Sequence, residues 1–176
     1  STLYAFAALK GDGSVTVWGK SDYGSTDPGL TSGVTKIFST DRAFAALKDD
    51  GSVKAWGNSG YGGTDPGITS GVTNIFSTDL AFAALKTDGS VQVWPGTDPG
   101  ITGGVVTIFS NYNAFAALKD DGSVQVWGQS SSGGTDPGIT SGVSTIFSTP
   151  YAFAALKTDG SVKAWGDSCC GGSDPG

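Results

Sequence analysis

The sequence predicts an all-β protein, a β-propeller or propeller-like array of five short blade repeats with about three strands each. Three observations lead to this fold class. The hexapeptide Ala-Phe-Ala-Ala-Leu-Lys occurs five times in 176 residues, an Asp-Gly pair follows each copy, and the composition is rich in Gly (29 residues) while all 16 acidic residues are Asp. A fixed period of about 20 to 50 residues is typical of solenoids and propellers.

The repeats follow one another at nearly constant spacing. Hexapeptides begin at Ala5, Ala43, Ala81, Ala114 and Ala152, which are 38 residues apart except for one step of 33. The length is that of one ordinary domain. We therefore expect a single repeat domain over residues 1–176, which is either a whole array or a segment of a longer one.

Each repeat predicts three strands in a fixed order. The first is an apolar segment such as Leu30 to Phe38, which ends in Ile-Phe; the second is the hexapeptide; the third is Ser-Val-x-(Val/Ala)-Trp. Asp-Gly, as in Asp12-Gly13, joins the second and third strands and predicts an antiparallel hairpin, because Gly tolerates the positive φ of the turn. Alternation within the hexapeptide predicts two packed faces, so the repeats should stack and bury their aromatic residues between them.

A Gly-rich loop and a Thr-Asp-Pro-Gly turn follow the Trp of each repeat, with Ser173 to Gly176 as the last such turn. Pro and Gly set the backbone of this turn. The third repeat lacks the loop and continues directly as Trp94-Pro95-Gly96, which marks the loop as a surface segment. Any fourth strand must be very short.

The run Ala-Phe-Ala-Ala-Leu-Lys-x-Asp-Gly-Ser-Val-x-x-Trp-Gly resembles the repeat of the regulator of chromosome condensation family. This resemblance covers most of the chain and implies propeller blades. The repeats are shorter than those of the family, the His that commonly precedes the second strand is missing, and five blades are fewer than the family's seven. The resemblance implies a fold and no exchange-factor activity, because nothing resembles the specialised loop which that activity needs.

Composition argues against several classes of function. The net charge is −6, the pI is about 4.3 and the ten basic residues are dispersed, so we expect no nucleic-acid partner. No apolar run is long enough for membrane insertion. There is no His and no Asp pair outside the turns. We therefore expect a protein that is not an enzyme and needs no cofactor.

One strand is absent from an otherwise cyclic pattern. Ser1-Thr2 is equivalent to Ser39-Thr40, so the first repeat lacks the segment that corresponds to Leu30 to Phe38. Three explanations compete. The chain is cut from a longer array, it closes with a defect, or another molecule supplies the strand, because an exposed strand edge is a template for pairing.

The two cysteines are adjacent and cannot join distant parts of the chain. Cys169 and Cys170 are candidates for a vicinal disulfide, for two free thiols or for bonds to other chains. They do not make a zinc site, because no other Cys and no His completes the ligands. The Asp residues recur in the hairpin and Thr-Asp-Pro-Gly turns, where a calcium site is conceivable but a turn-forming role is favoured, so we expect no metal site.

The loops after the Trp differ most between repeats and are the predicted binding residues: Tyr23, Tyr61, Ser131 within Ser130 to Ser132, Cys169 and Cys170. An exposed Tyr in such a loop can stack on a sugar ring.

Two functions remain. The first is a non-catalytic structural or assembly module that polymerises through its unpaired strand edge, with copies of itself or a longer parent chain as partner. The alternative is a lectin-like propeller that binds glycans weakly at each blade and gains avidity from repetition. The Cys pair, the Gly and Ser/Thr content and the acidity favour an extracellular or cell-surface location.

Overall fold

The computed structural model describes residues 1–174 and is all-β, as predicted. The Pro175-Gly176 part of the last predicted turn lies outside the described residues. Fourteen strands are present: β1 Ala5–Leu9, β2 Val15–Gly19, β3 Val34–Ser39, β4 Ala43–Lys48, β5 Val53–Gly57, β6 Val72–Ser77, β7 Phe82–Lys86, β8 Val91–Trp94, β9 Val105–Ser110, β10 Ala114–Lys119, β11 Val124–Gly128, β12 Val143–Ser148, β13 Ala152–Lys157 and β14 Val162–Gly166. A short 3₁₀ turn comes after β2, β5, β11 and β14: η1 Ser21–Tyr23, η2 Ser59–Tyr61, η3 Ser130–Ser132 and η4 Ser168–Cys170.

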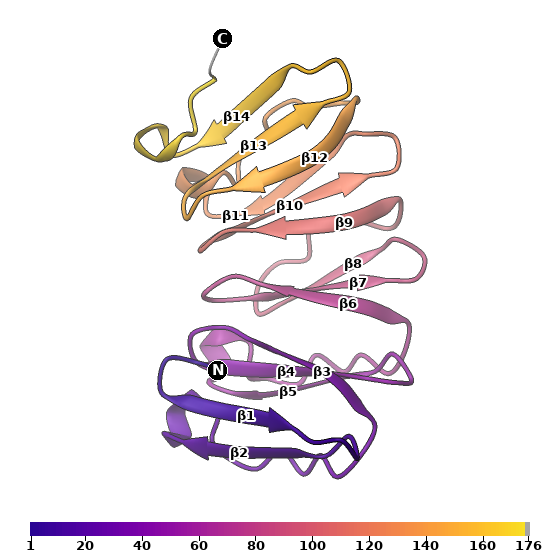
Figure 1. Ribbon diagram of the computed structural model, residues 1–176, viewed down its shortest axis with the longest axis vertical. Coiled ribbons are helices and arrows are strands. Elements are labelled where there is room, and N and C mark those ends of the chain that lie inside the picture. The colour runs from indigo at the N-terminus through magenta and orange to yellow at the C-terminus, as the bar shows by residue number, and fades with distance from the viewer. Residues whose placement is uncertain (175–176) are drawn as a thin grey trace. The chain divides into compact units, whose positions relative to one another are not determined.

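The strands form five separate antiparallel sheets, one for each repeat (Figure 1). Four sheets have three strands in the orders β3-β4-β5, β6-β7-β8, β9-β10-β11 and β12-β13-β14, and the hexapeptide strand is always central. The first sheet has β1 and β2 alone, so the strand that the sequence pattern lacks is absent from its outer edge. The three-strand repeat is confirmed for the other four.

The Asp-Gly hairpins form as the sequence predicts. In the second repeat Ala43 pairs with Gly57 and Leu47 with Val53, and Gly51 occupies the turn with φ 75°. The carboxylate of Asp50 accepts a hydrogen bond of 2.8 Å from the backbone N–H of Ser52. An Asp that bonds the backbone two residues on is a common turn-forming device, so the hairpin is fixed locally.

Alternation along the hexapeptide buries both faces of the sheet. Phe44 and Ala46 pack in one cluster with Ala5 and Val15 of the preceding sheet. Ala43, Ala45 and Leu47 belong to a second cluster with side chains of the following sheet, among them Phe82. The prediction that neighbouring repeats stack face to face is confirmed here, and it explains why no single blade holds a core of its own.

The chain divides into two compact units. The first contains residues 1–87 and 91–101, and the second contains residues 88–90 and 102–174 of the described chain. Each has its own buried cluster, with Ile75 and Phe82 in the first and Ile146 and Phe153 in the second. That residues 1–176 make one domain stays a prediction.

The first strand of each blade is shorter than predicted. It begins at Val34 and not at Leu30, because Gly33 has φ 78° and interrupts the extended backbone. No fourth strand is present in any repeat over residues 1–174. Instead, the carbonyl of Ile68 accepts a single hydrogen bond of 3.0 Å from the N–H of Val53 at the start of β5.

Candidate functional site

A recurring joint connects successive sheets within each compact unit. The ring of Phe44 stacks on Trp56 with centroids 5.3 Å apart, and Trp56 Nε1 donates a hydrogen bond of 3.0 Å to the carbonyl of Gly24 in the preceding repeat. The same bond joins Trp94 to Gly62 at 3.2 Å and Trp165 to Gly133 at 3.1 Å. We call the Phe–Trp pair and the loop glycine of the preceding repeat the joint.

Only glycine fits the loop side of the joint. Gly24 has φ 96°, and a Cβ at this position would lie 2.7 Å from Cδ2 of Phe44. Phe44 is fully buried and has no room to move away. The Gly-rich loops, which the sequence marks only as surface segments, therefore have a packing role.

Not every joint is complete. The Phe115–Trp127 pair has no loop glycine before it, because the third repeat lacks the loop, and Trp127 Nε1 is buried without a hydrogen-bond partner among the described residues.

At the first and last repeats one half of the joint is exposed. In the first repeat, Phe6 and Trp18 stack with centroids 5.3 Å apart but are 52% and 51% exposed, against 0% for Phe44 and 6% for Trp56. In the last repeat, a Cβ on Gly171 would have no atom within 4 Å. The structure therefore presents one uncovered aromatic pair and one uncovered glycine loop.

Two variable segments meet at one end of four of the sheets, where the hexapeptide strand begins and the Trp strand ends; the third repeat lacks the loop. Thr40 Oγ1, in the turn before β4, donates a hydrogen bond of 2.9 Å to the carbonyl of Tyr61 in η2. The equivalent bonds join Thr2 to Tyr23, Asn111 to Ser132 and Thr149 to Cys170. The predicted binding loops are thus tied to the preceding turn, and together they form what we call the variable edge.

The turn part of the variable edge was not singled out by the sequence analysis. All five of its dipeptides differ, although the flanking residues are nearly constant: Leu3-Tyr4, Asp41-Arg42, Asp79-Leu80, Tyr112-Asn113 and Pro150-Tyr151. Five large hydrophobic side chains here are exposed: Leu3, Tyr4, Leu80, Tyr112 and Tyr151. In the sequence, these variable dipeptides become visible only when the five repeats are aligned with one another.

Cations and tyrosines alternate along the variable edge of the first compact unit. Lys20 Nζ lies 5.2 Å from the ring centroid of Tyr23, and Arg42 Cζ lies 4.9 Å from Tyr23 and 4.8 Å from Tyr61. Such cation–π contacts stabilise the cation over the ring face. Arg42 Nε is buried without a hydrogen-bond partner among the described residues.

The predicted binding residues differ in accessibility. The expectation of an exposed tyrosine is wrong for Tyr23, which is 7% exposed because Tyr4 packs edge-on against it and Arg42 covers its ring. Tyr61 is half-buried for a similar reason.

The remaining predicted residues lie in η3 and η4. Ser131 and Cys169 are exposed and Cys170 is half-buried. Both thiols are free in this structure, and the choice among the three alternatives for this pair stays a prediction. What these residues bind stays a prediction.

Two carboxylates of neighbouring turns lie close together on the variable edge. The N–H of Asp41 donates a hydrogen bond of 3.0 Å to the carbonyl of Asp79. Partial burial raises the pKa of Asp79, and the charge of Asp41 raises it further. The edge therefore holds a carboxylate that favours the protonated form more than an isolated Asp does.

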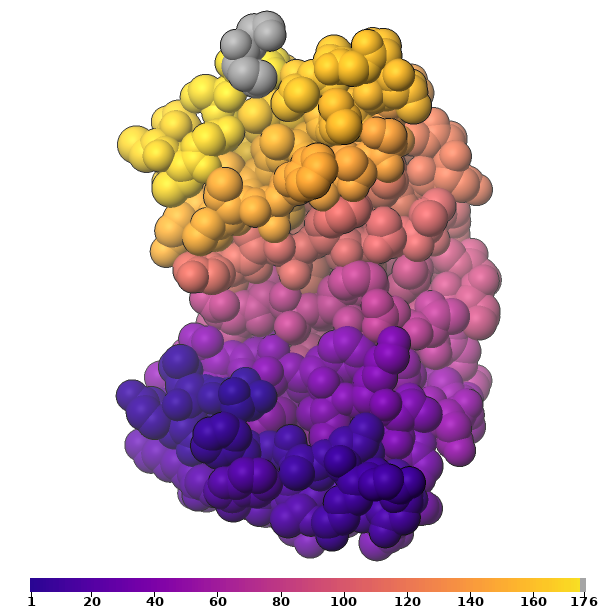
Figure 2. Space-filling view, viewed as in Figure 1, coloured from indigo at the N-terminus to yellow at the C-terminus, as the bar shows by residue number. Residues whose placement is uncertain are grey.

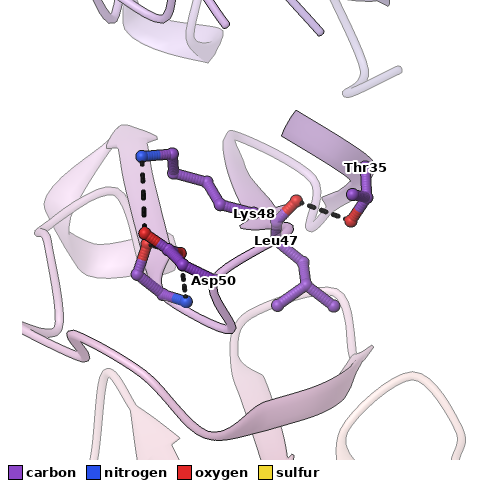
Figure 3. A network of polar contacts seen from close by, with 5 residues as sticks. Thr35, Leu47, Lys48 and Asp50 are labelled. Carbon is purple, nitrogen blue, oxygen red and sulfur yellow. Dashed lines mark hydrogen bonds and ion pairs between the residues drawn. The ribbon is translucent and has the colours of Figure 1, made fainter. Parts of the chain in front are cut away.

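The opposite edge of each sheet is constant. Thr35 Oγ1 donates a hydrogen bond of 3.1 Å to the carbonyl of Leu47, and Lys48 Nζ lies 3.9 Å from a carboxylate oxygen of Asp50. Figure 3 shows these residues and both contacts. Shallow depressions here, of about 410 Å³ and 460 Å³, are lined by equivalent residues of different repeats, Lys10 and Asp12 in one and Lys119 and Asp121 in the other. A constant lining offers every blade the same surface.

The Asp residues of the constant edge form turns, as expected. Asp27 accepts a hydrogen bond of 2.9 Å from the N–H of Gly29, and Asp12 accepts one of 2.9 Å from Ser14. Over residues 1–174, no three His, Cys, Asp or Glu side chains lie close enough together to hold a metal ion. No helix in this part of the chain is long and apolar enough to span a membrane.

Comparison with known proteins places the fold. No protein-family model and no curated protein matches the chain. Among solved structures, the ectodomain of the Physcomitrella patens receptor kinase CR4 is similar with a TM-score of 0.66 at 16% identity, over 92% of this chain and 49% of that chain. The CRINKLY WD40 ectodomain of the Arabidopsis thaliana receptor kinase ACR4 gives 0.63 at 17%, over 99% and 64%.

Prp20p from Saccharomyces cerevisiae gives a TM-score of 0.64 at 17% identity, over 94% of this chain and 56% of that chain. A further structure identifies Prp20 as yeast RCC1. The predicted resemblance to regulator-of-chromosome-condensation repeats is confirmed at the level of fold. The chain spans between 49% and 64% of the length of these three structures.

Proposed function

We propose that the chain is a non-catalytic protein-interaction module that binds its partner through the variable edge. The observation that carries this proposal is the distribution of sequence differences. Dipeptides such as Asp41-Arg42 and Tyr112-Asn113 change in every repeat, while the stacked Phe–Trp pair and the Asp-Gly hairpin recur in all five. Residues that vary on a constant scaffold set specificity, as loops do on other rigid folds.

The chemistry of the variable edge fits a protein partner. Exposed Tyr4, Leu80 and Tyr151 supply apolar contact area. Arg42 adds a guanidinium to the same edge, where it lies over the rings of Tyr23 and Tyr61. Tyr and Arg are enriched among the residues that dominate binding energy at protein interfaces. The absence of His from the sequence and the use of Asp12 and Asp27 in turns support a role without catalysis.

Structural neighbours support the same class of function. The Prp20p structure is described with its binding to Gsp1p and histones, and a second structure shows yeast RCC1 bound to Kap60. Those are properties of the yeast protein, and only the use of the fold as a protein-binding scaffold is carried into this proposal. The receptor-kinase ectodomains support the extracellular or cell-surface location that we propose.

The test compares two sets of substitutions in the full chain. One variant carries Tyr4→Ser, Leu80→Ser, Tyr112→Ser and Tyr151→Ser on the variable edge. Its control carries Val106→Ser, Phe147→Ser and Val162→Ser, which are exposed hydrophobic residues elsewhere. A defined partner obtained by selection from a displayed protein library should bind the wild type and the control and lose affinity for the variable-edge variant by about 30-fold or more. Equal loss in both variants would contradict the proposal.

A second candidate function is glycan binding. Tyr4 and Tyr112 are exposed on the variable edge, and an exposed tyrosine ring can stack on a sugar. The test is a glycan array probed with the wild-type chain and with the variant that carries Tyr4→Ser and Tyr112→Ser. Binding by the wild type alone would support a lectin-like module, whereas a blank array would overturn it.

The assembly role includes polymerisation through the open edge of the first sheet. β1 pairs with β2 only, so the backbone groups of its other side have no strand beside them in residues 1–174. The side chains of β1 are also less covered than those of a complete sheet: Leu9 is 39% exposed, whereas its equivalent Leu47 is 5% exposed. An open strand edge of this kind accepts a strand from another molecule.

A further inference from the structure

We propose that two copies of this chain associate head to tail, the last glycine loop of one copy docking on the Phe6–Trp18 pair of the next. In this contact Trp18 Nε1 donates a hydrogen bond to the carbonyl of Gly171 of the second copy. The inference deepens the assembly part of the proposed function by naming the partner and the surface. It does not use the variable edge or the open strand edge of β1.

The aromatic half of this contact is already in the geometry of a closed joint. Phe6 and Trp18 stack with centroids 5.3 Å apart and an interplanar angle of 17°, and the buried pair Phe44–Trp56 has 5.3 Å and 25°. In Figure 2 the N-terminal segment of the first compact unit, coloured indigo, lies at the surface. No rearrangement of this half is therefore needed for docking.

The glycine half is also preformed. Gly171 has φ 94°, close to the 96° of Gly24, which occupies a closed joint. Two hydrogen bonds hold the loop: Asp167 accepts one of 2.8 Å from the N–H of Cys169, and Thr149 Oγ1 donates one of 2.9 Å to the carbonyl of Cys170. A loop fixed in its bound conformation loses little entropy on binding.

A second copy of the chain is the occupant that these two halves define. The joint is an established interface that forms inside the chain at Trp56, Trp94 and Trp165. Docking would continue it with the same residue types on both sides. Because the two surfaces differ, the contact is heterologous and leaves one open half at each end of the dimer. Association should therefore continue beyond two copies as concentration rises.

Sedimentation velocity over a concentration series tests the proposal in the full chain. We call the Phe6–Trp18 pair the head and the loop that contains Gly171 the tail. Trp18→Ser removes the hydrogen-bond donor and most of the apolar area of the head. Gly171→Ala blocks the tail, because the equivalent Cβ on Gly24 would lie 2.7 Å from a Phe ring, although on Gly171 of a single copy it meets no atom within 4 Å. Each variant should weaken association by about 30-fold or more.

Each variant has a matched control. Phe147→Ser removes an aromatic ring that is 60% exposed and outside any joint. Gly138→Ala places an Ala at a similar positive φ of 71° with no atom within 4 Å, and the equivalent Gly29, Gly67 and Gly100 are open in the same way. Both controls should associate as the wild type does.

Mixing the two variants provides the decisive measurement. The Trp18→Ser chain keeps an intact tail and the Gly171→Ala chain keeps an intact head, so a 1:1 mixture should form a dimer and nothing longer. A dimer in the mixture also shows that both variants are folded. If the mixture stays monomeric while the controls and the wild type associate, another surface mediates assembly and the head-to-tail contact is wrong.

Two further outcomes separate this inference from the proposed function. A wild-type chain that stays monomeric at all concentrations overturns the contact. The variable-edge variant (Tyr4→Ser, Leu80→Ser, Tyr112→Ser, Tyr151→Ser) should still self-associate. Its loss of partner binding with retained association would show that the two surfaces act independently.

Discussion

The indole nitrogen of Trp56 lies 3.0 Å from the carbonyl oxygen of Gly24, 32 positions earlier in the chain. This hydrogen bond crosses from one repeat to the next, and the same spacing recurs in two other joints. Both ends are buried, so loss of the donor leaves a carbonyl without a partner. The joint therefore couples the stability of each blade to that of its neighbour.

Trp56→Phe should lower the free energy of unfolding by about 2 kcal/mol, because it removes this hydrogen bond and part of the buried ring. Trp18→Phe is the matched control, since Trp18 is half exposed and should change stability by less than about 0.5 kcal/mol. Urea denaturation at a concentration where the chain is monomeric measures both. Equal effects would mean that the joint bond adds nothing to stability.

Gly62→Ala should destabilise the chain by about 3 kcal/mol, because its Cβ would lie 2.6 Å from Cδ2 of the buried Phe82. Gly67→Ala carries the cost of a positive φ alone, with no atom within 4 Å, and should lose only about 1 kcal/mol. Thermal and urea unfolding of both variants check the difference. A cost for Gly62→Ala no larger than for Gly67→Ala would show that the loop moves away from Phe82.

The hairpin aspartates predict a loss of stability in acid. Hydrogen bonds from the side chain and backbone N–H of Ser52 lower the pKa of Asp50, and Ser14 does the same for the pKa of Asp12. A lowered folded pKa contributes stability that is present above the ordinary carboxyl pKa and is lost as pH falls through the folded value. Ser14→Ala combined with Ser52→Ala should flatten this decline in urea midpoints between about pH 5 and pH 2. An unchanged decline would assign it to other groups.

Asp79 predicts the opposite dependence. Its pKa is raised by partial burial first and by Asp41 second, so its charged form disfavours folding once pH exceeds the ordinary carboxyl pKa. Asp79→Asn should stabilise the chain at neutral pH and leave stability unchanged well below pH ~3. The control is Asp22→Asn, an exposed Asp on η1. Stabilisation that persists in acid would point to the amide's own hydrogen bonds and away from charge.

The open edge of β1 should accept a strand in trans. A synthetic peptide of residues 30–39 carries the sequence of the missing strand, and the equivalents of its Ile37 are buried in other sheets, at 1% exposure for Ile75. At saturating concentration it should raise the midpoint of thermal unfolding by a few degrees. The same peptide with Ile37→Asp is the control. Equal effects of both peptides, or none, would exclude strand completion at this edge.

Much of the fold was predictable because its determinants are local. Asp50-Gly51 specifies a hairpin by its own chemistry, and the alternation of Phe44 and Ala45 specifies two faces. The start of the first strand was predicted four residues early, because a positive φ at Gly33 is not visible in hydrophobic patterning. Turn chemistry and periodicity thus determine the blade, with errors at its boundaries.

The candidate site was harder to predict because its contacts join distant repeats. Burial of Tyr23 depends on Tyr4 and Arg42, which precede and follow it by about half a repeat, so loop composition alone indicated an exposed ring. The bond between Trp56 and Gly24 likewise links segments that no local pattern relates. The turn dipeptides could have been found by aligning the repeats, since they change while their neighbours do not.

Separation of the joints from the variable edge gives the chain an unusual mutational freedom. Residues such as Leu80 and Tyr112 contribute little to the buried clusters, so substitutions there can alter recognition at small cost in folding. The joints tolerate little change, because each one links a Trp to a glycine 32 positions earlier in the chain. An in-frame gain or loss of one 38-residue repeat would bring matching halves together again, so blade number can change without the invention of a new interface.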